Sequence, residues 1–69
     1  MPILNVLLWE GRTVEQKRAL AERLTQDMVD IAKVPAESVV ITFSDFVKSD
    51  WAEGGLLASD KIRIQVPQP

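Results

Sequence analysis

The chain of 69 residues contains no cysteine and no histidine. A disulfide framework is therefore excluded, and so is a metal site ligated by histidine or cysteine. Long apolar runs are missing as well, and without a stretch of about 20 apolar residues we expect no membrane span. Eight Lys and Arg residues stand against ten Asp and Glu, without a basic block, so we expect no nucleic-acid partner. The start of the chain lacks a basic segment and a cleavage site typical of a signal peptide, which predicts a cytoplasmic protein.

The chain is short for a stable fold. Residues 1–69 make a single domain, and hydrophobic residues form 46% of it, which is typical of a globular protein. A chain of this length removes only about 60% of its unfolded surface from water when it folds alone. Because no disulfide is present to compensate, we expect further burial between copies of the chain.

The first half of the chain alternates between strand and helix signals. The apolar run at residues 3–9 predicts a strand buried on both faces, and Glu10-Gly11-Arg12 predicts a turn after it. Thr13 and Gln16 fit a capping box, which places the first helical residue at Val14. Pro35 predicts that the helix ends near Lys33. Four apolar residues at spacings of four, four and three mark its buried face: Leu20, Leu24, Met28 and Ile31.

The second half predicts a second strand at residues 39–43, a tight turn at Gly54-Gly55 and a half-exposed strand at residues 61–66. A strand, a crossover helix and a second strand normally form a right-handed parallel pair. Two strands under one helix make a thin structure, which again favours completion of the sheet by neighbouring copies.

Pro2 is the first candidate catalytic residue. We expect removal of Met1, since a small residue follows it, and removal would leave Pro2 with a free secondary amine. Such an amine is an effective base when burial and nearby cations favour its neutral form. The alternative is that proline is merely tolerated at this position because no hydrogen bond needs its missing N–H.

Several short motifs together resemble the small subunits of the 4-oxalocrotonate tautomerase family. They are Pro2 before a strand, Glu10-Gly11-Arg12 followed by Glu15-Gln16-Lys17, and Gly54-Gly55 followed by Leu57-Ala58-Ser59. The resemblance covers about the first sixty residues. It implies an α+β fold: a β-α-β unit with a parallel strand pair, one long helix and a short C-terminal hairpin, completed by oligomerisation. It also implies a homo-oligomer, with a hexamer favoured, and an enzyme without metal or organic cofactor.

The resemblance also assigns roles to individual residues. Pro2 would be the general base, and Arg12 would bind the carboxylate of a small-molecule substrate through its bidentate guanidinium. Trp51 matches an aromatic residue that keeps the surroundings of the base apolar. Without the resemblance, Arg12 would be interpreted as a solvated loop residue and Trp51 as core or subunit interface.

Two positions depart from the family pattern. Val40 stands where the family has a second substrate-binding arginine, so the developing oxyanion needs another donor. The candidates are an ordered water, a backbone N–H, or Arg63 or Lys48 of a neighbouring copy.

The other departure is Glu53, which stands where the related trans-3-chloroacrylic acid dehalogenase has a water-activating glutamate. That enzyme also has an arginine where this chain has Trp9, and Glu53 could instead be a surface loop residue. The resemblance thus implies a tautomerase of small unsaturated 2-oxo or 2-hydroxy carboxylates. The alternatives are a hydratase or dehalogenase of 3-substituted acrylates that uses Glu53, and a non-catalytic oligomeric scaffold.

Overall fold

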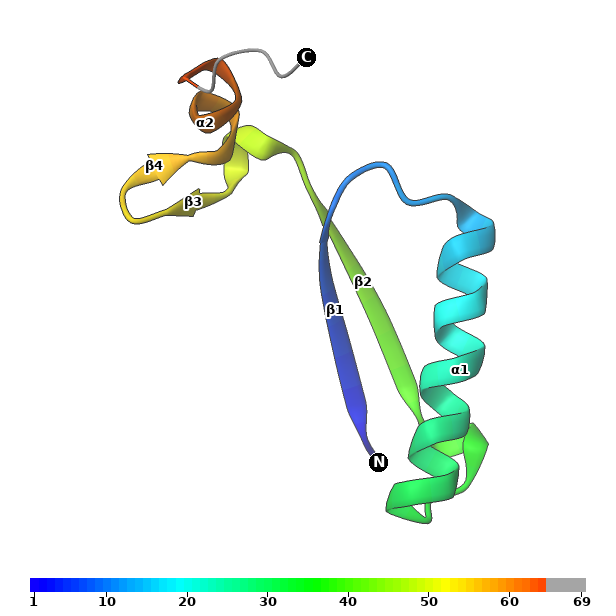
Figure 1. The fold of residues 1–69 in the computed structure, drawn as a ribbon. Helices are drawn as coiled ribbons and strands as arrows, with labels where there is room; N and C mark the ends of the chain where they lie inside the picture. The colour runs from blue at the N-terminus through cyan, green and yellow to red at the C-terminus, as the bar shows by residue number, and fades with distance from the viewer. Residues whose placement is uncertain (65–69) are drawn as a thin grey trace.

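The computed structural model describes residues 1–64, with the side chains of residues 1–61. Two strands and a long helix form its main body, and a short hairpin and a second helix follow at one end (Figure 1). The elements are β1 (Ile3–Trp9), α1 (Val14–Ala32), β2 (Val40–Phe46), β3 (Ala52–Glu53), β4 (Leu56–Leu57) and α2 (Ala58–Ile64). The chain therefore has the expected β-α-β unit, long helix and C-terminal hairpin.

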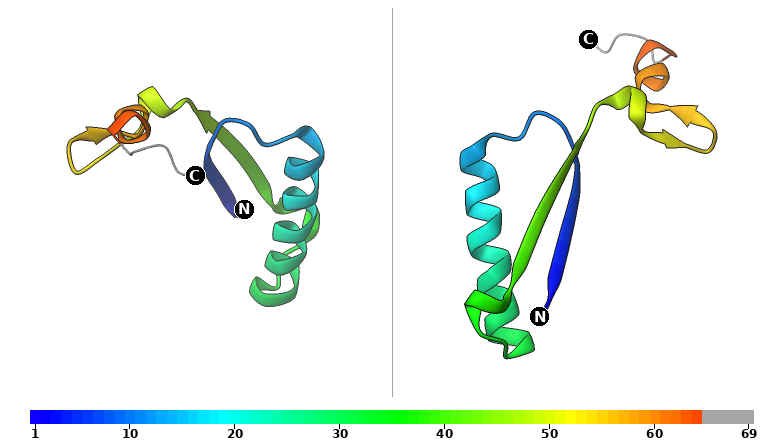
Figure 2. Two further views of the ribbon diagram at one scale, coloured as in Figure 1. Left: turned by 45° about the horizontal axis from the view of Figure 1, so that its top comes forward. Right: turned by 180° about the vertical axis from the view of Figure 1, so that it is seen from behind.

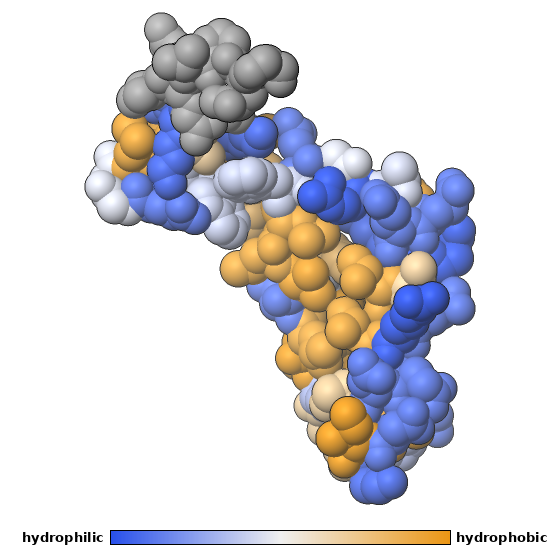
Figure 3. Space-filling view, in the orientation of Figure 1, coloured by the Kyte–Doolittle hydropathy of each residue, from blue (hydrophilic) through white to orange (hydrophobic). Residues whose placement is uncertain are grey.

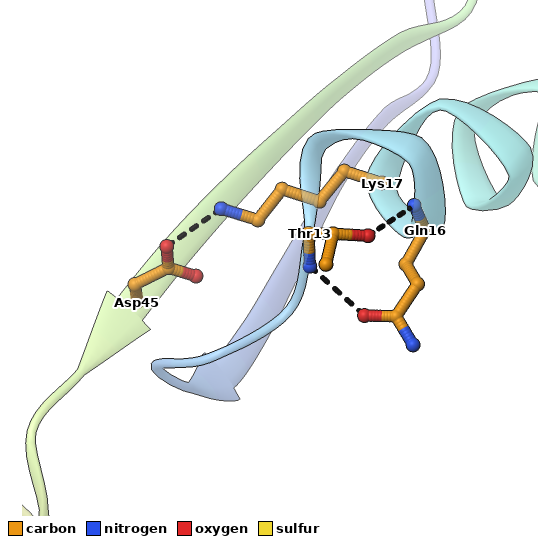
Figure 4. A network of polar contacts seen from close by, with 4 residues as sticks. All are labelled: Thr13, Gln16, Lys17 and Asp45. Atoms are coloured by element: carbon orange, nitrogen blue, oxygen red, sulfur yellow. Dashed lines mark hydrogen bonds and ion pairs between the residues drawn. The ribbon is translucent and has the colours of Figure 1, made fainter.

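Strands β1 and β2 pair in parallel, in a register that runs from Ile3 opposite Val40 to Trp9 opposite Phe46. The predicted parallel pair is confirmed. The second strand begins one residue later than predicted and continues three residues further, to Phe46. The polar residues Ser44 and Asp45 concealed this extension. Asp45 is accommodated in the strand because Lys17 of α1 lies 2.6 Å from its carboxylate (Figure 4).

The start and end of α1 agree with the sequence prediction. The Thr13 hydroxyl accepts a hydrogen bond from the Gln16 backbone N–H at 3.0 Å, and the Gln16 side chain accepts one from the Thr13 N–H at 2.9 Å (Figure 4). This reciprocal pair satisfies two of the free N–H groups at the helix start. The helix ends at Ala32, and Lys33 takes the left-handed conformation with φ 60°.

Helix α1 covers only one face of the sheet. Leu4, Val6 and Leu8 on that face are half-buried, whereas Ile3 and Leu7, on the outer face, are 67% and 51% exposed. The prediction of a strand buried on both faces is therefore wrong within residues 1–64, where Trp51 packs on Trp9 and Phe46 at one end of the outer face and leaves Ile3 and Leu7 exposed.

On the helix, three of the four residues of the predicted apolar face are half-buried: Leu20, Leu24 and Met28. Ile31 is 79% exposed, in the last turn of α1.

The C-terminal part turns at Gly54-Gly55, as predicted. Both glycines have positive φ, 60° and 83°, which suits a two-residue hairpin loop between β3 and β4. The strand expected at residues 61–66 is wrong for residues 61–64, which belong to α2; residues 65 and 66 lie outside the described residues. The Ala58 N–H donates to the Trp51 carbonyl at 2.7 Å, and Asp60 then lies in the first helical turn, where a carboxylate is favourable.

The shape of the chain is far from compact (Figure 2). Its radius of gyration is 16.3 Å, whereas a compact domain of this length would have about 11 Å. It exposes 5488 Å², against about 4,300 Å² for a compact monomer of this mass. Ala58, at 4% exposure, is the one fully buried apolar residue among those described. The surface excess of about 1,200 Å² is comparable with the area buried in a stable protein interface.

Apolar side chains gather over the sheet, between the polar outer side of α1 and the hairpin (Figure 3). None of the helices in residues 1–64 is long and apolar enough to cross a membrane.

Candidate active site

Pro2 lies at the start of β1 and is half-buried. Its carbonyl accepts a hydrogen bond from the Val40 N–H at 3.0 Å, which fixes the residue to the first position of the parallel pair. With Met1 attached, the Pro2 nitrogen is a tertiary amide and has no useful basicity. Removal of Met1 would convert it into a secondary amine held at a strand end.

Arg12 and Trp51 lie at the opposite end of the sheet from Pro2. The Glu10 N–H donates to the Phe46 carbonyl at 2.8 Å, where the two strands end. Glu10 lies eight positions after Pro2, which in a strand corresponds to about 26 Å. The structure therefore does not bring Pro2 together with Arg12 and Trp51 within one chain.

Three aromatic side chains, which we call the aromatic cluster, meet at this far end: Trp9, Phe46 and Trp51. The Trp51 ring centroid lies 6.0 Å from that of Trp9 and 5.7 Å from that of Phe46, both in edge-to-face geometry. The ammonium of Lys48 lies 5.0 Å from the centroid of the Trp9 ring, a cation–π contact. The cluster thus combines an apolar surface with one positive charge.

Glu53 lies beside the aromatic cluster and is held by two donors. Its Oε2 accepts a hydrogen bond from the Trp51 indole N–H at 3.2 Å, and its Oε1 accepts one from the Lys61 ammonium at 2.7 Å. The hydrogen bond from Lys61, then that from Trp51 and the charge of Lys61, lower the pKa of Glu53 below its ordinary value. The carboxylate is thus ionised, and each of its oxygens has a partner.

Val40 leaves the strand start without a positive charge. It pairs with Ile3, so both residues at this end of the sheet are apolar. Of the two side chains considered as replacements for an arginine here, that of Arg63 lies outside the described residues. Lys48 lies at the other end of the sheet, on the aromatic cluster, and the ion pairs within residues 1–61 involve Lys17 and Lys61 instead.

Phe46 and Lys61 are neighbours of Trp51 and Glu53 that no sequence pattern indicated. Phe46 was missed because the second strand was predicted to end at Phe43. Lys61 was missed because it was placed in a strand, whereas α2 carries it to within 2.7 Å of Glu53. Trp9 ends an apolar stretch, but Phe46 follows the polar residues Ser44 and Asp45, so no local pattern indicated that the two rings meet. In the described part of the chain, no group of three or more Asp and Glu residues is placed to hold a metal ion.

Comparisons with known proteins converge on one family. Residues 2–61 match the family model for tautomerase enzymes. A probable tautomerase of Bacillus cereus is 41% identical over 61 residues, which is 88% of this chain and 100% of the relative. A 2-hydroxymuconate tautomerase of Comamonas testosteroni is 32% identical over 87% of this chain and 95% of the relative.

Solved structures of similar fold indicate the same family. A 4-oxalocrotonate tautomerase isozyme of Methylibium petroleiphilum superposes with a TM-score of 0.87 at 30% identity, over 93% of this chain and all of that one. A heterohexamer 4-oxalocrotonate tautomerase of Chloroflexus aurantiacus gives a TM-score of 0.79 at 28% identity, over 87% and 97% of the two chains.

Proposed function

The chain belongs to the 4-oxalocrotonate tautomerase family, and from this premise we propose that it moves a proton within a small unsaturated 2-oxo or 2-hydroxy carboxylate. The observation that carries the proposal is the position of Pro2. Its backbone is fixed at the start of a strand by the bond from Val40, so that an amine released there by loss of Met1 would have a defined place. No metal or organic cofactor is required, because the substrate's own conjugated carbonyl accepts the electrons.

We propose that the site is completed by further copies of the chain. Pro2 and the aromatic cluster are separated by the length of β1, so one substrate cannot touch both within a chain. The outer face of the sheet combines exposed apolar side chains, Ile3, Leu7 and Val40, with a hydrogen-bonded polar group at Asn5, and it supplies a surface through which copies can associate. The likeness to a heterohexameric tautomerase supports an assembly of six chains, which we take to be a homohexamer.

In the assembled site, Pro2 would take a proton from the dienol and return it to a carbon further along the conjugated chain. Arg12, from another copy, would hold the substrate carboxylate with two parallel hydrogen bonds. Trp51 would form an apolar wall that favours the neutral amine and strengthens the contact of Arg12 with the bound anion.

Lys48 is our candidate for the cation that faces the developing oxyanion in place of the arginine absent at position 40. Its ammonium lies over Trp9, and Trp9 contacts Trp51. An arrangement of copies that brings Trp51 to Pro2 therefore brings Lys48 into the same neighbourhood. A preorganised positive charge at this place would stabilise the negative charge that develops in the transition state.

The test begins with the intact mass of the purified protein, which reports whether Met1 is present. Protein that begins with Pro2 is then incubated with 2-hydroxymuconate and with phenylenolpyruvate, and ketonisation is followed. We expect turnover by the parent and a loss of more than about 100-fold in Pro2→Ala, the scale of a general base. Equal rates for the two proteins would remove Pro2 from the mechanism.

The rival reaction, addition of water to a 3-haloacrylate, needs Glu53 to accept a proton. A lowered pKa and two engaged oxygens make Glu53 a weak base. We therefore expect no halide release from 3-haloacrylates by the parent protein. Release that disappears in Glu53→Gln would favour the hydratase instead, and inactivity in both assays would favour a scaffold.

A further inference from the structure

We infer that Glu53 is a positioning residue for Trp51. Its carboxylate, held by Lys61, fixes the orientation of the indole ring that lines the site. The inference rests on the proposed function for the importance of Trp51, but the contacts themselves are independent of any substrate.

The contacts connect α2 to the aromatic cluster through three successive side chains. Lys61 belongs to α2, Glu53 to β3, and Trp51 precedes β3, so the ion pair and the hydrogen bond join the end of the hairpin to the second helix. Lys61 draws one oxygen of the carboxylate, which leaves the other directed at the indole N–H.

The indole needs such a partner because its aromatic contacts do not fix it completely. Edge-to-face packing on Trp9 and Phe46 fixes the position of the ring but supplies no acceptor for its N–H. The indole N–H is a donor without an acceptor function, and a bond from it to a carboxylate selects one of the two ring orientations. Glu53 therefore determines which edge of Trp51 faces the substrate.

A backbone hydrogen bond also holds Trp51 in place. The Ala58 N–H donates to the Trp51 carbonyl at 2.7 Å, and Ala58 is the fully buried residue at the start of α2. The backbone of Trp51 and its side chain are thus each tied to the segment that carries Lys61. Loss of Glu53 would release the side chain while the backbone tie remains.

The experiment compares Glu53→Ala and Glu53→Gln with a control, Glu22→Ala, which removes an exposed carboxylate from the outer side of α1. The first readout needs no substrate. Two tryptophans in edge-to-face contact give an exciton couplet in the far-ultraviolet circular dichroism, and Trp9→Phe identifies its contribution. We expect the couplet to fall strongly in Glu53→Ala, less in Glu53→Gln, whose amide oxygen still accepts from the indole, and not at all in Glu22→Ala.

The second readout is a double-mutant cycle with Trp51→Phe, whose ring has no N–H. We expect Glu53→Ala to lower kcat/KM for ketonisation by about three- to tenfold in the parent, the scale of one exposed hydrogen bond. In the Trp51→Phe background the same change should cost less than about twofold, because its partner is gone. The acidic limb of the pH profile should move to higher pH in Glu53→Ala, since a loosened wall admits water to the amine.

An unchanged couplet in Glu53→Ala would overturn the inference, even if the parent protein had no activity on either substrate. An equal loss of kcat/KM in both backgrounds would also overturn it, since Glu53 would then act without Trp51. Failure of the proposed function is distinguished from these results because it removes only the second readout and leaves the first to decide.

Discussion

The outer face of the β1–β2 sheet makes a strong prediction about assembly, which can be tested by placing a charge at Leu7. Leu7 is 51% exposed in the chain and lies in the middle of this face. Complete burial of a leucine side chain is worth about 1.5–3 kcal/mol, so about 1 kcal/mol remains to be gained at Leu7 when a copy covers it. Leu7→Asp replaces this gain with the cost of burying a carboxylate, which is several kcal/mol.

The lost burial of Leu7 and the cost of burying the carboxylate together weaken association by about 4 kcal/mol for each copy. Every copy of a closed assembly carries the substitution. Since 1.4 kcal/mol is a factor of ten, the association constant should fall by about a thousandfold per chain. Sedimentation velocity at matched concentrations should show the parent as a hexamer and Leu7→Asp as smaller species.

The matched control is Ala19→Asp, which places the same charge on the exposed side of α1, away from the face that covers the sheet. Far-ultraviolet circular dichroism checks that both variants keep their helix. The reasoning is refuted if a helical Leu7→Asp sediments as the parent does at every concentration, because the outer face would then not be an interface.

Three further predictions concern single contacts. Thr13→Ala removes one half of the capping box and should lower the free energy of unfolding by about 1 kcal/mol, measured by urea denaturation, whereas Thr13→Ser should retain most of it. The tryptophan exciton couplet should be constant at pH values above 4.5, the ordinary carboxyl pKa of Glu53. It should fall only as the pH drops through the lowered pKa of Glu53, because protonation removes the ion pair to Lys61. A midpoint above pH 4.5 would contradict the lowered pKa. Lys48→Met should lower kcat for ketonisation by about tenfold or more, with partial recovery in Lys48→Arg, while Arg23→Met, a loss of the same charge from the exposed middle of α1, should have no effect.

The local elements of the fold could be predicted because their signals lie within a few neighbouring residues. The capping pair Thr13 and Gln16 fixes the start of α1, and Gly54-Gly55 fixes the hairpin turn. Strand β2 was predicted too short, because Asp45 reads as a surface residue until its ion pair to Lys17, 28 positions away, is known. The same limit applies to α2, whose apolar residues alternate in the sequence as those of a strand would.

The residues of the candidate site could be predicted from the sequence, but their positions relative to one another could not. Pro2, Arg12 and Trp51 could be named from their motifs, but a motif does not say which residues of one chain can meet. Only the length of β1 shows that Pro2 and Trp51 lie at opposite ends of the sheet. The role of Glu53 could not be predicted for a similar reason. It depends on a contact with Lys61, and the alternating pattern of residues 61–66 predicts a strand there instead of the helix that carries Lys61.

The incomplete fold and the divided site have one common cause. In residues 1–64, one long helix and two long strands leave much of one face of the sheet uncovered, and the length of β1 separates Pro2 from its apolar wall by about 26 Å. Association of copies through that face would bury the uncovered residues and could place the aromatic cluster of one chain beside Pro2 of another. Activity should then depend on protein concentration in the range where the assembly dissociates. Leu7→Asp, which lies in neither part of the site, should lose activity together with the hexamer.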